Sequence, residues 1–187
     1  LAAPVLALAH AMRMSSPVLV VAGPMMRAVA EKNRVNVGLA APDREHMVYL
    51  ESFRYNRKVS LRNVVAGQRV PVELTSLGRA YLASLEASAR KQLLLRLKAS
   101  RSQSWRGIEK DIEKAIDDIQ TRGFCWAAWQ PGVVAVAAPL KLNDGKVYSL
   151  NISVTSERPP YDVARELKVP LLELRRELME ALNSASR

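Results

Sequence analysis

Helix-like and strand-like hydrophobic patterns alternate along the chain, which predicts a mixed fold of the α/β (α+β) class. Residues 133–142 and 146–154 form two apolar strands on either side of Asn143-Asp144-Gly145, a tripeptide that favours a hairpin and hence an antiparallel pair. Residues 104–123 instead carry apolar side chains at helical spacing. With 187 residues, of which 49% are hydrophobic, the chain can bury a substantial core in one main domain.

The apolar first 33 residues predict two helices. One stripe of an opening helix, with spacings of four and three, comprises Leu1, Val5, Leu8 and Met12. So narrow a stripe favours packing against a partner helix. Ser15 or Ser16 before Pro17 predicts the start of a second helix, which runs through Gly23-Pro24 to about Lys32. Arginines interrupt both apolar pieces, so we expect no membrane span.

Four strands are predicted next. Residues 35–41 and 47–53 form a strand pair joined by the polar turn 42–46. Residues 59–65 and 70–74 add two shorter strands around a glycine.

A helix start directly follows the fourth of these strands. Thr75 has a side-chain oxygen that can cap a helix, which we expect to run from Ser76 to Leu97. Its first backbone N–H groups, those of Ser76, Leu77 and Gly78, have no partner within the helix and can bind an anion. The alternative is an ordinary capped helix whose N–H groups meet water.

The second half of the chain continues the alternation. A helix from Ser104 should end at Gly123, a short strand should occupy 124–126, and Pro131-Gly132 should break the chain before the apolar strand 133–142. A last helix is predicted after Pro170. Its buried side is formed by Leu171, Leu174, Leu178 and Leu182.

The strand 146–154 has two different faces, because side chains alternate along a strand. Asn151 and Ser153 lie on a polar face that could be exposed to water or could line a cavity. The preceding strand is apolar on both faces, so both sides of the sheet must be covered. We therefore expect Asn151 and Ser153 to line an enclosed, partly polar site.

The net charge of +10 raises the alternative of a nucleic-acid-binding module. The excess is concentrated in residues 51–100, which carry +7. Aromatic residues, which would stack on bases, make up only 5% of the chain, so a solvated basic face is the preferred interpretation. A purely structural dimerisation domain is a further alternative.

Catalytic and metal sites are not predicted. The single cysteine, Cys125, excludes an internal disulfide and favours a reducing cytoplasmic setting, and with His10 and His46 it forms no cluster at metal-ligand spacing. There is no G-x-S-x-G elbow and no glycine-rich phosphate loop. We expect no enzyme activity, no metal and no cofactor.

Several segments together resemble the effector-binding domain of IclR-type bacterial transcriptional regulators, over nearly the whole chain. The matching segments are VNVGLA (35–40), MVYLES (47–52), VPVELTSLGRAYLA (70–83), RGF (122–124), PGVVAVAAPL (131–140) and DGKVYSLNISV (144–154). The resemblance implies a GAF-like domain, in which a curved antiparallel sheet has helices on one face and a ligand pocket on the other. It also implies a linker helix at 1–16, an effector domain at 17–187, and a homodimer or homotetramer. A winged helix-turn-helix domain absent from this chain would bind operator DNA.

The resemblance also implies an effector site for a small organic acid. In this sequence, backbone amides at Ser76 and Leu77, after the Thr75 cap, would hold a carboxylate, and Asn151 and Ser153 would supply polar side chains. The remaining wall positions are Val59, Leu61, Arg62, Val70, Val133, Trp126, Ala127 and Ala135. Two of these, Ala127 and Ala135, stand where members that sense small acids carry Asp and Cys. With Trp126 and Trp129 nearby, this favours a roomier pocket for an aromatic carboxylate.

Overall fold

The computed structural model describes residues 3–55, 65–100 and 105–185. The helices are α1 (Ala3–Ser15), α2 (Pro17–Asn33), α3 (Ser76–Ser84), α4 (Ala87–Ser100), α5 (Trp105–Arg122) and α6 (Pro160–Ala185). The strands are β1 (Asn36–Asp43), β2 (His46–Arg54), β3 (Arg69–Pro71), β4 (Cys125–Gln130), β5 (Val133–Lys141) and β6 (Val147–Thr155). No helix within the described ranges is long and apolar enough to cross a membrane.

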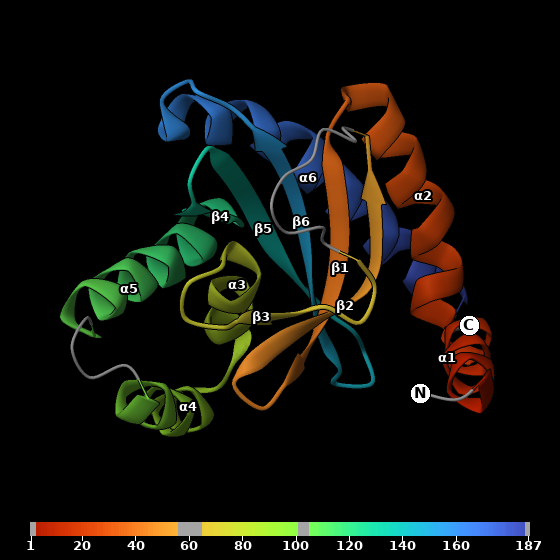
Figure 1. Cartoon of the computed structure of the whole chain (residues 1–187), viewed down its shortest axis with the longest axis horizontal. Helices are drawn as coiled ribbons and strands as arrows, with labels where there is room; N and C mark the ends of the chain where they lie inside the picture. The colour runs from red at the N-terminus through yellow and green to blue at the C-terminus, as the bar shows by residue number, and fades with distance from the viewer. Residues whose placement is uncertain (1–2, 56–64, 101–104, 186–187) are drawn as a thin grey trace.

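The six described strands form one antiparallel sheet in the order β3-β2-β1-β6-β5-β4 (Figure 1). The predicted hairpins are present. Asp43 pairs with His46 and Lys141 pairs with Val147, so the polar turns lie where the sequence indicates. Arg44 and Gly145 adopt positive φ angles of 55° and 81°, which tight hairpin turns require.

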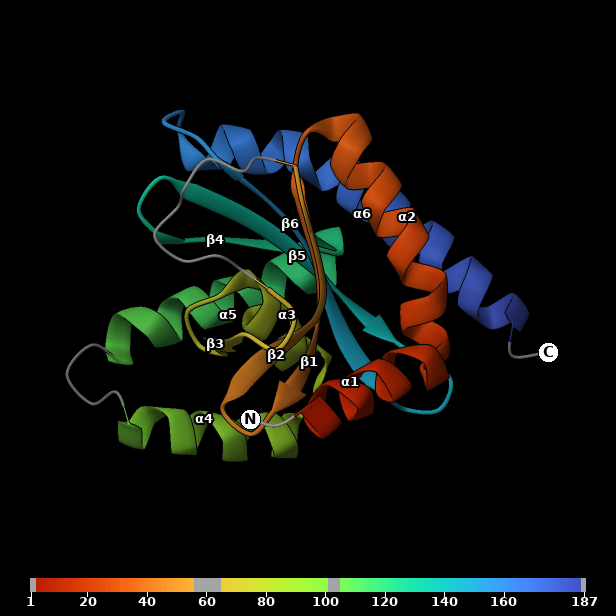
Figure 2. The same ribbon diagram turned by 45° about the vertical axis from the view of Figure 1, so that its right-hand side comes forward.

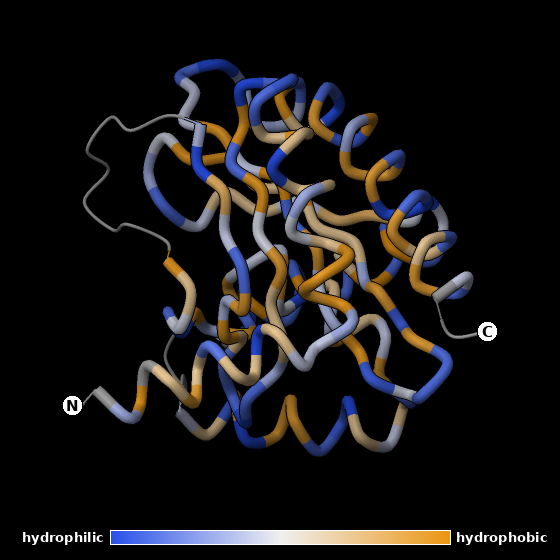
Figure 3. Tube along the Cα trace, turned by 90° about the vertical axis from the view of Figure 1, so that its right-hand side faces the viewer, coloured by the Kyte–Doolittle hydropathy of each residue, from blue (hydrophilic) through white to orange (hydrophobic). Residues whose placement is uncertain are grey.

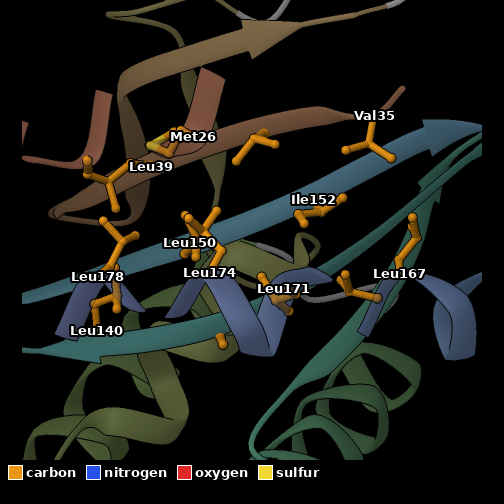
Figure 4. Close-up of a cluster of buried hydrophobic side chains, with 14 of the residues drawn as sticks. Met26, Val35, Leu39, Leu140, Leu150, Ile152, Leu167, Leu171, Leu174 and Leu178 are labelled. Carbon is orange, nitrogen blue, oxygen red and sulfur yellow. The ribbon is translucent and has the colours of Figure 1, made fainter. Parts of the chain in front are cut away.

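Helices α2 and α6 cover one face of the sheet, and α3, α4 and α5 lie on the other side (Figure 2). The larger core lies under α2 and α6, where Met26 and the α6 leucines meet Leu39, Leu150 and Ile152 of the sheet (Figure 4). The predicted inward leucines of α6 are at most 6% exposed. Along α6, which runs to the C-terminus in Figure 3, hydrophobic and hydrophilic residues alternate, as expected for a helix with one buried side.

A second core lies on the opposite face. There Val70, Val72 and Leu77 pack with Met47 and Tyr49, together with leucines of α4 and Ile112 of α5. Strand β5 is thus apolar on both faces, as residues 133–142 predict. Helices therefore cover both faces of the sheet in the described structure.

A β-bulge at Leu50 changes the orientation of β2. Leu39 pairs with Glu51 and Ala40 pairs with Tyr49, so Leu50 is the extra residue. As a result Tyr49 faces α3, whereas Glu51 faces the α1 and α2 side and forms an ion pair with Arg13. Simple alternation would place Tyr49 and Glu51 on the same face.

The structure corrects two predicted helix boundaries. The helix predicted for 76–97 is two helices, because the chain leaves helical geometry at Leu85 (φ −77°, ψ 147°). The side chain of Arg90 donates hydrogen bonds to the carbonyls of Leu82 and Leu85 and satisfies the end of α3. The last helix begins at Pro160, ten residues before Pro170, which lies inside it. Buried Val163, Ala164 and Leu167 stabilise this additional N-terminal part by packing on the sheet.

The predicted strand 59–65 lies mostly outside the described residues. The strand predicted for 70–74 is shorter, since β3 ends at Pro71 and a turn carries the chain to Thr75. The opening helix is present as α1, and Val5, Leu8 and Met12 of its predicted stripe are 45%, 71% and 47% exposed. Leu1 lies outside the described residues.

Helix α3 can approach the turn before it only because residue 78 is glycine. A Cβ atom at Gly78 would lie 2.1 Å from the carbonyl oxygen of Val72, a backbone clash. Gly78→Ala should therefore lower the free energy of unfolding by about 2 kcal/mol or more, despite the better helix propensity of alanine. The measurement is urea denaturation.

Gly107→Ala provides the matched control. Gly107 lies in α5, and a Cβ atom at this position would have no neighbouring atom within 4 Å. This variant should gain about 0.5 to 1 kcal/mol, the ordinary helix effect. Equal stability of the two variants would contradict the close packing of α3 on Val72.

Candidate functional site

Thr75 caps α3 as the sequence predicts. Its hydroxyl accepts a hydrogen bond from the N–H of Gly78 (3.1 Å) and donates one to the carbonyl of Pro71 (2.8 Å). The first helical bond runs from the N–H of Arg79 to the carbonyl of Thr75. Ser76 and Leu77 are at most 2% exposed, and no described residue accepts a hydrogen bond from their N–H groups. The start of α3 therefore presents two free donors in a buried position.

Cys125 connects the start of α3 to the sheet. Its thiol donates a hydrogen bond to the carbonyl of Ser76, at 3.4 Å. Burial raises the pKa of this thiol to about 12, so it stays protonated and remains a donor at neutral pH. One turn further along α3, Ala80 packs against Ala137 and Ala115. Small side chains thus let α3 lie close to β4 and β5.

Arg79 connects α3 to α5. Its Nε donates to the carbonyl of Glu73 (3.1 Å), and its Nη2 forms an ion pair with Asp111 (3.1 Å). The Arg79 side chain is only 10% exposed, whereas that of Asp111 is 62% exposed. This bridge fixes the position of the loop that leads into α3 relative to α5.

The sheet beneath the start of α3 presents two rows of mostly small residues. Cross-strand pairing places Asn36, Ser153, Ala135 and Ala127 in one row. The neighbouring row contains Gly38, Asn151, Ala137 and Cys125. Cys125, at one end of the second row, contacts Ser76 at the start of α3. The second row therefore extends from beneath the start of α3 to Asn151.

Three side-chain oxygens on this face are buried and make no hydrogen bond within the described part of the chain. They belong to Asn36 (Oδ1), Ser149 (Oγ) and Asn151 (Oδ1). A buried polar atom without a partner costs about 1 to 3 kcal/mol, so such atoms are rare in a folded domain. Three of them on one face of one sheet single out this face as the candidate site.

Tyr49 stands beside this polar group. Its phenolic oxygen accepts a hydrogen bond from Asn151 Nδ2 at 3.4 Å, and burial raises its pKa to about 12. Gly38 makes room for this contact, since a Cβ there would lie 2.5 Å from both Asn151 Oδ1 and the Tyr49 ring. Tyr49 therefore stays neutral and keeps an O–H donor next to Asn151.

The structure brings most of the predicted site residues to one region. Thr75, Ser76, Leu77 and Val70 lie at the start of α3 and on β3. Those on the facing surface of the sheet are Ala127, Val133, Ala135, Asn151 and Ser153. Val59, Leu61 and Arg62 lie outside the described residues.

The position of Trp126 differs from the predicted one. Trp126 packs against the core under α2 and α6, on the face opposite Asn151, because it follows Cys125 directly and side chains alternate along β4. Trp129, in contrast, packs with the second core on the α3 side. Of the two tryptophans predicted near the site, Trp129 lies on the same face as Asn151 and Trp126 does not.

Tyr49, Asn36 and Gly38 were not predicted as site residues. Alternation along residues 47–53 pairs Tyr49 with Glu51, and only the bulge at Leu50 separates them. The sequence of residues 35–40 does indicate a special face, because Asn36 and Gly38 lie on the same side of an otherwise apolar strand.

Comparisons with known proteins agree with this architecture. The family described as "Bacterial transcriptional regulator IclR C-terminal" matches residues 10–183. The Pca regulon regulatory protein of Pseudomonas putida is 25% identical over 174 residues, which are 90% of this chain and 59% of that protein. The chain thus spans less than two thirds of the length of this relative.

Solved structures of the same fold cover almost the entire chain. An IclR family transcriptional regulator from Brucella abortus superposes with a TM-score of 0.84 at 27% identity, over 97% of this chain and 69% of that one. The C-terminal domain of the E. coli regulator KdgR gives 0.70 at 19% identity, over 88% and 98%. An IclR homolog from Microbacterium hydrocarbonoxydans, complexed with 4-hydroxybenzoate, gives 0.72 at 17% identity, over 92% and 72%. The predicted α+β fold is confirmed.

The raised pKa of Tyr49 predicts a loss of stability at alkaline pH. The unfolded chain releases this proton near pH 10 and the folded chain only near 12, so stability is complete below pH 10 and falls as pH rises toward 12. Between pH 9 and 11, wild type should lose about 1 kcal/mol more unfolding free energy than Tyr49→Phe. Urea denaturation at both pH values measures this difference.

Tyr161→Phe is the control, because Tyr161 is 52% exposed. It should lose stability with pH as wild type does. If Tyr49→Phe also followed wild type, Tyr49 would not be buried against Asn151.

Proposed function

This chain belongs to the IclR family of bacterial transcriptional regulators as their C-terminal, effector-binding domain, and from this premise we propose that it senses an aromatic carboxylate. The family consists of regulators, which confirms the prediction that the chain is not an enzyme. The effector would lie between the start of α3 and the row of Asn36, Ala135 and Ser153. The observation that carries this proposal is the set of buried, unpartnered polar atoms on that face.

The carboxylate end would meet the N–H groups of Ser76 and Leu77. Both groups lie at the N-terminus of a nine-residue helix, where the helix dipole favours negative charge. Burial of both residues excludes competing water and strengthens such hydrogen bonds. A carboxylate with two oxygens can accept one bond from each N–H group.

The end of the effector opposite its carboxylate would need to carry a hydrogen-bond donor. The unpartnered atoms of Asn36 and Asn151 are carbonyl oxygens, which can only accept. A hydroxyl group on the effector would satisfy one of them. Cys125, whose thiol touches the carbonyl of Ser76, and Asn151 are separated by strand β5, so their backbones lie about 10 Å apart. This separation suits an aromatic acid with a distal hydroxyl better than a two- or three-carbon acid.

The lining between the two ends is apolar. Ala127 and Ala135 are paired neighbours on the floor, and Val70, Leu77 and Trp129 belong to the adjoining core. Alanines leave room for a ring and supply no hydrogen-bonding group to a shorter acid. The homolog of the same fold from Microbacterium hydrocarbonoxydans is complexed with 4-hydroxybenzoate, which supports this choice of effector class.

Effector binding would alter operator binding through α1, the proposed linker helix at 1–16. Arg13 of α1 forms an ion pair with Glu51, whose side chain is 9% exposed. Glu51 is two residues from Tyr49, on the other side of the bulge in β2. A ligand that moves Tyr49 would thus act on the strand that holds α1. Operator binding through a further domain, and assembly as a dimer or tetramer, belong to this proposal.

Calorimetry with a panel of acids tests the effector class. We expect 4-hydroxybenzoate to bind at least about tenfold more tightly than benzoate, since a hydrogen bond to a buried acceptor is worth about 1 kcal/mol or more. Glyoxylate and pyruvate should bind more weakly than either. Tight binding of glyoxylate without binding of any benzoate would overturn the proposed class.

Asn151→Leu tests the polar end of the site. It should weaken 4-hydroxybenzoate binding by about tenfold while benzoate binding changes little, because only the hydroxyl needs the Asn151 oxygen. Asn33→Leu, at the exposed end of α2, is the control with the same chemical change. Unchanged affinity for 4-hydroxybenzoate in a folded Asn151→Leu variant would remove Asn151 from the site.

A further inference from the structure

A cavity lies on the face of the sheet opposite the candidate site, where β4 meets α6. It has a volume of about 290 Å³ and is separated from the candidate site by the sheet itself. The residues that line it are Arg122, Phe124, Trp126, Tyr161, Ala164, Arg165, Lys168 and Leu172. Three of them are aromatic, three are cationic and none is acidic.

One wall of the cavity is a stripe of α6. Tyr161, Arg165, Lys168 and Leu172 follow each other at spacings of four, three and four, so they share one side of the helix. This wall exists because α6 begins at Pro160 and continues through Pro170. The opposite wall comes from the end of α5 and the start of β4.

Gly123 joins α5 to β4 and brings Arg122 and Phe124 to the same cavity. Its φ of 79° makes a sharp turn, and a Cβ atom there would be 3.6 Å from Leu172 of α6. Trp126 follows on the same face of β4 as Phe124. On α5, the ammonium of Lys114 lies 6.0 Å from the centre of the Trp126 ring. Phe124 and Trp126 are therefore held by packed elements.

The charge around this cavity is not balanced. Arg122 has a partner in Asp118 at 3.4 Å, but no ion pair within the described residues includes Arg165 or Lys168. Three cations that converge on one cavity repel one another, and an anion bound between them would remove this cost. A dianion such as phosphate balances such a cluster better than a carboxylate, and arginine and lysine are both suited to phosphate oxygens.

We propose that this cavity binds a ligand in which a planar aromatic ring is joined to a phosphate, the chemistry of a nucleotide. The phosphate lies between Arg122, Arg165 and Lys168, and the ring packs against Trp126 and Tyr161. Both a free mononucleotide and the phosphorylated end of a nucleic acid carry this chemistry. The site is independent of the proposed effector site, because the two use opposite faces of the sheet.

Isothermal titration with AMP tests the site in the chain as it stands. AMP should bind at least about tenfold more tightly than ribose 5-phosphate, which lacks the ring, because stacking of one base contributes about a factor of ten. Adenosine, which lacks the phosphate, should also be weaker than AMP. A 5′-phosphorylated oligothymidylate that binds more tightly than AMP would identify nucleic acid as the source, and weaker binding would identify the free nucleotide.

Two sets of variants separate the contributions. Arg165→Glu combined with Lys168→Glu should weaken AMP binding at least about tenfold. Arg176→Glu, an exposed arginine on the same helix outside the cavity, should leave AMP binding unchanged. Trp126→Leu should weaken AMP but leave ribose 5-phosphate unchanged, and circular dichroism checks that each variant folds.

The proposal is overturned if AMP does not bind, or if the double charge reversal and Arg176→Glu affect AMP equally. Asn151→Leu must leave AMP binding intact. The Asn151→Leu substitution changes only the face that carries the effector site. It therefore distinguishes failure of the nucleotide site from failure of the effector site.

Discussion

The close packing of α3 on the sheet is the constraint on which the rest of this domain depends. Helix α3 is short, and it meets the turn before it and strand β5 through residues with little or no side chain. Gly78 lies against the backbone of Val72, and Ala80 lies against Ala137. Larger residues at these positions would lift the helix and separate its first N–H groups from the polar face of β6. The same contact thus determines the second core and the geometry of the candidate site.

Buried polar atoms without a partner in the described structure mark the proposed effector face. A folded domain usually satisfies its buried oxygens, yet Asn36, Ser149 and Asn151 each keep one without a partner in the described structure. The domain gives up stability at this surface, and a ligand with matching donors would recover it. The buried thiol of Cys125 and phenol of Tyr49 remain protonated, so neither places a negative charge beside the position proposed for a carboxylate.

Much of this arrangement could be predicted from the sequence because it depends on local rules. Alternation placed Asn151 and Ser153 on the polar face, and Thr75 was identified as a cap from its position after a strand. Errors arose where packing overrides local signals. Pro170 is typical of a helix start, but buried residues upstream hold α6 together across it. The bulge at Leu50 moved Tyr49 to the site, and the side chain of Trp126 was assigned to the wrong face of β4.

Backbone amide chemical shifts, followed during a titration with 4-hydroxybenzoate, show whether the start of α3 binds the carboxylate. We expect the largest changes at the N–H groups of Ser76 and Leu77, with a matching change at the side-chain amide of Asn151. These signals report the two ends of the proposed site separately. If all three signals remain unchanged at saturation while the ligand binds elsewhere, the start of α3 is not the carboxylate site.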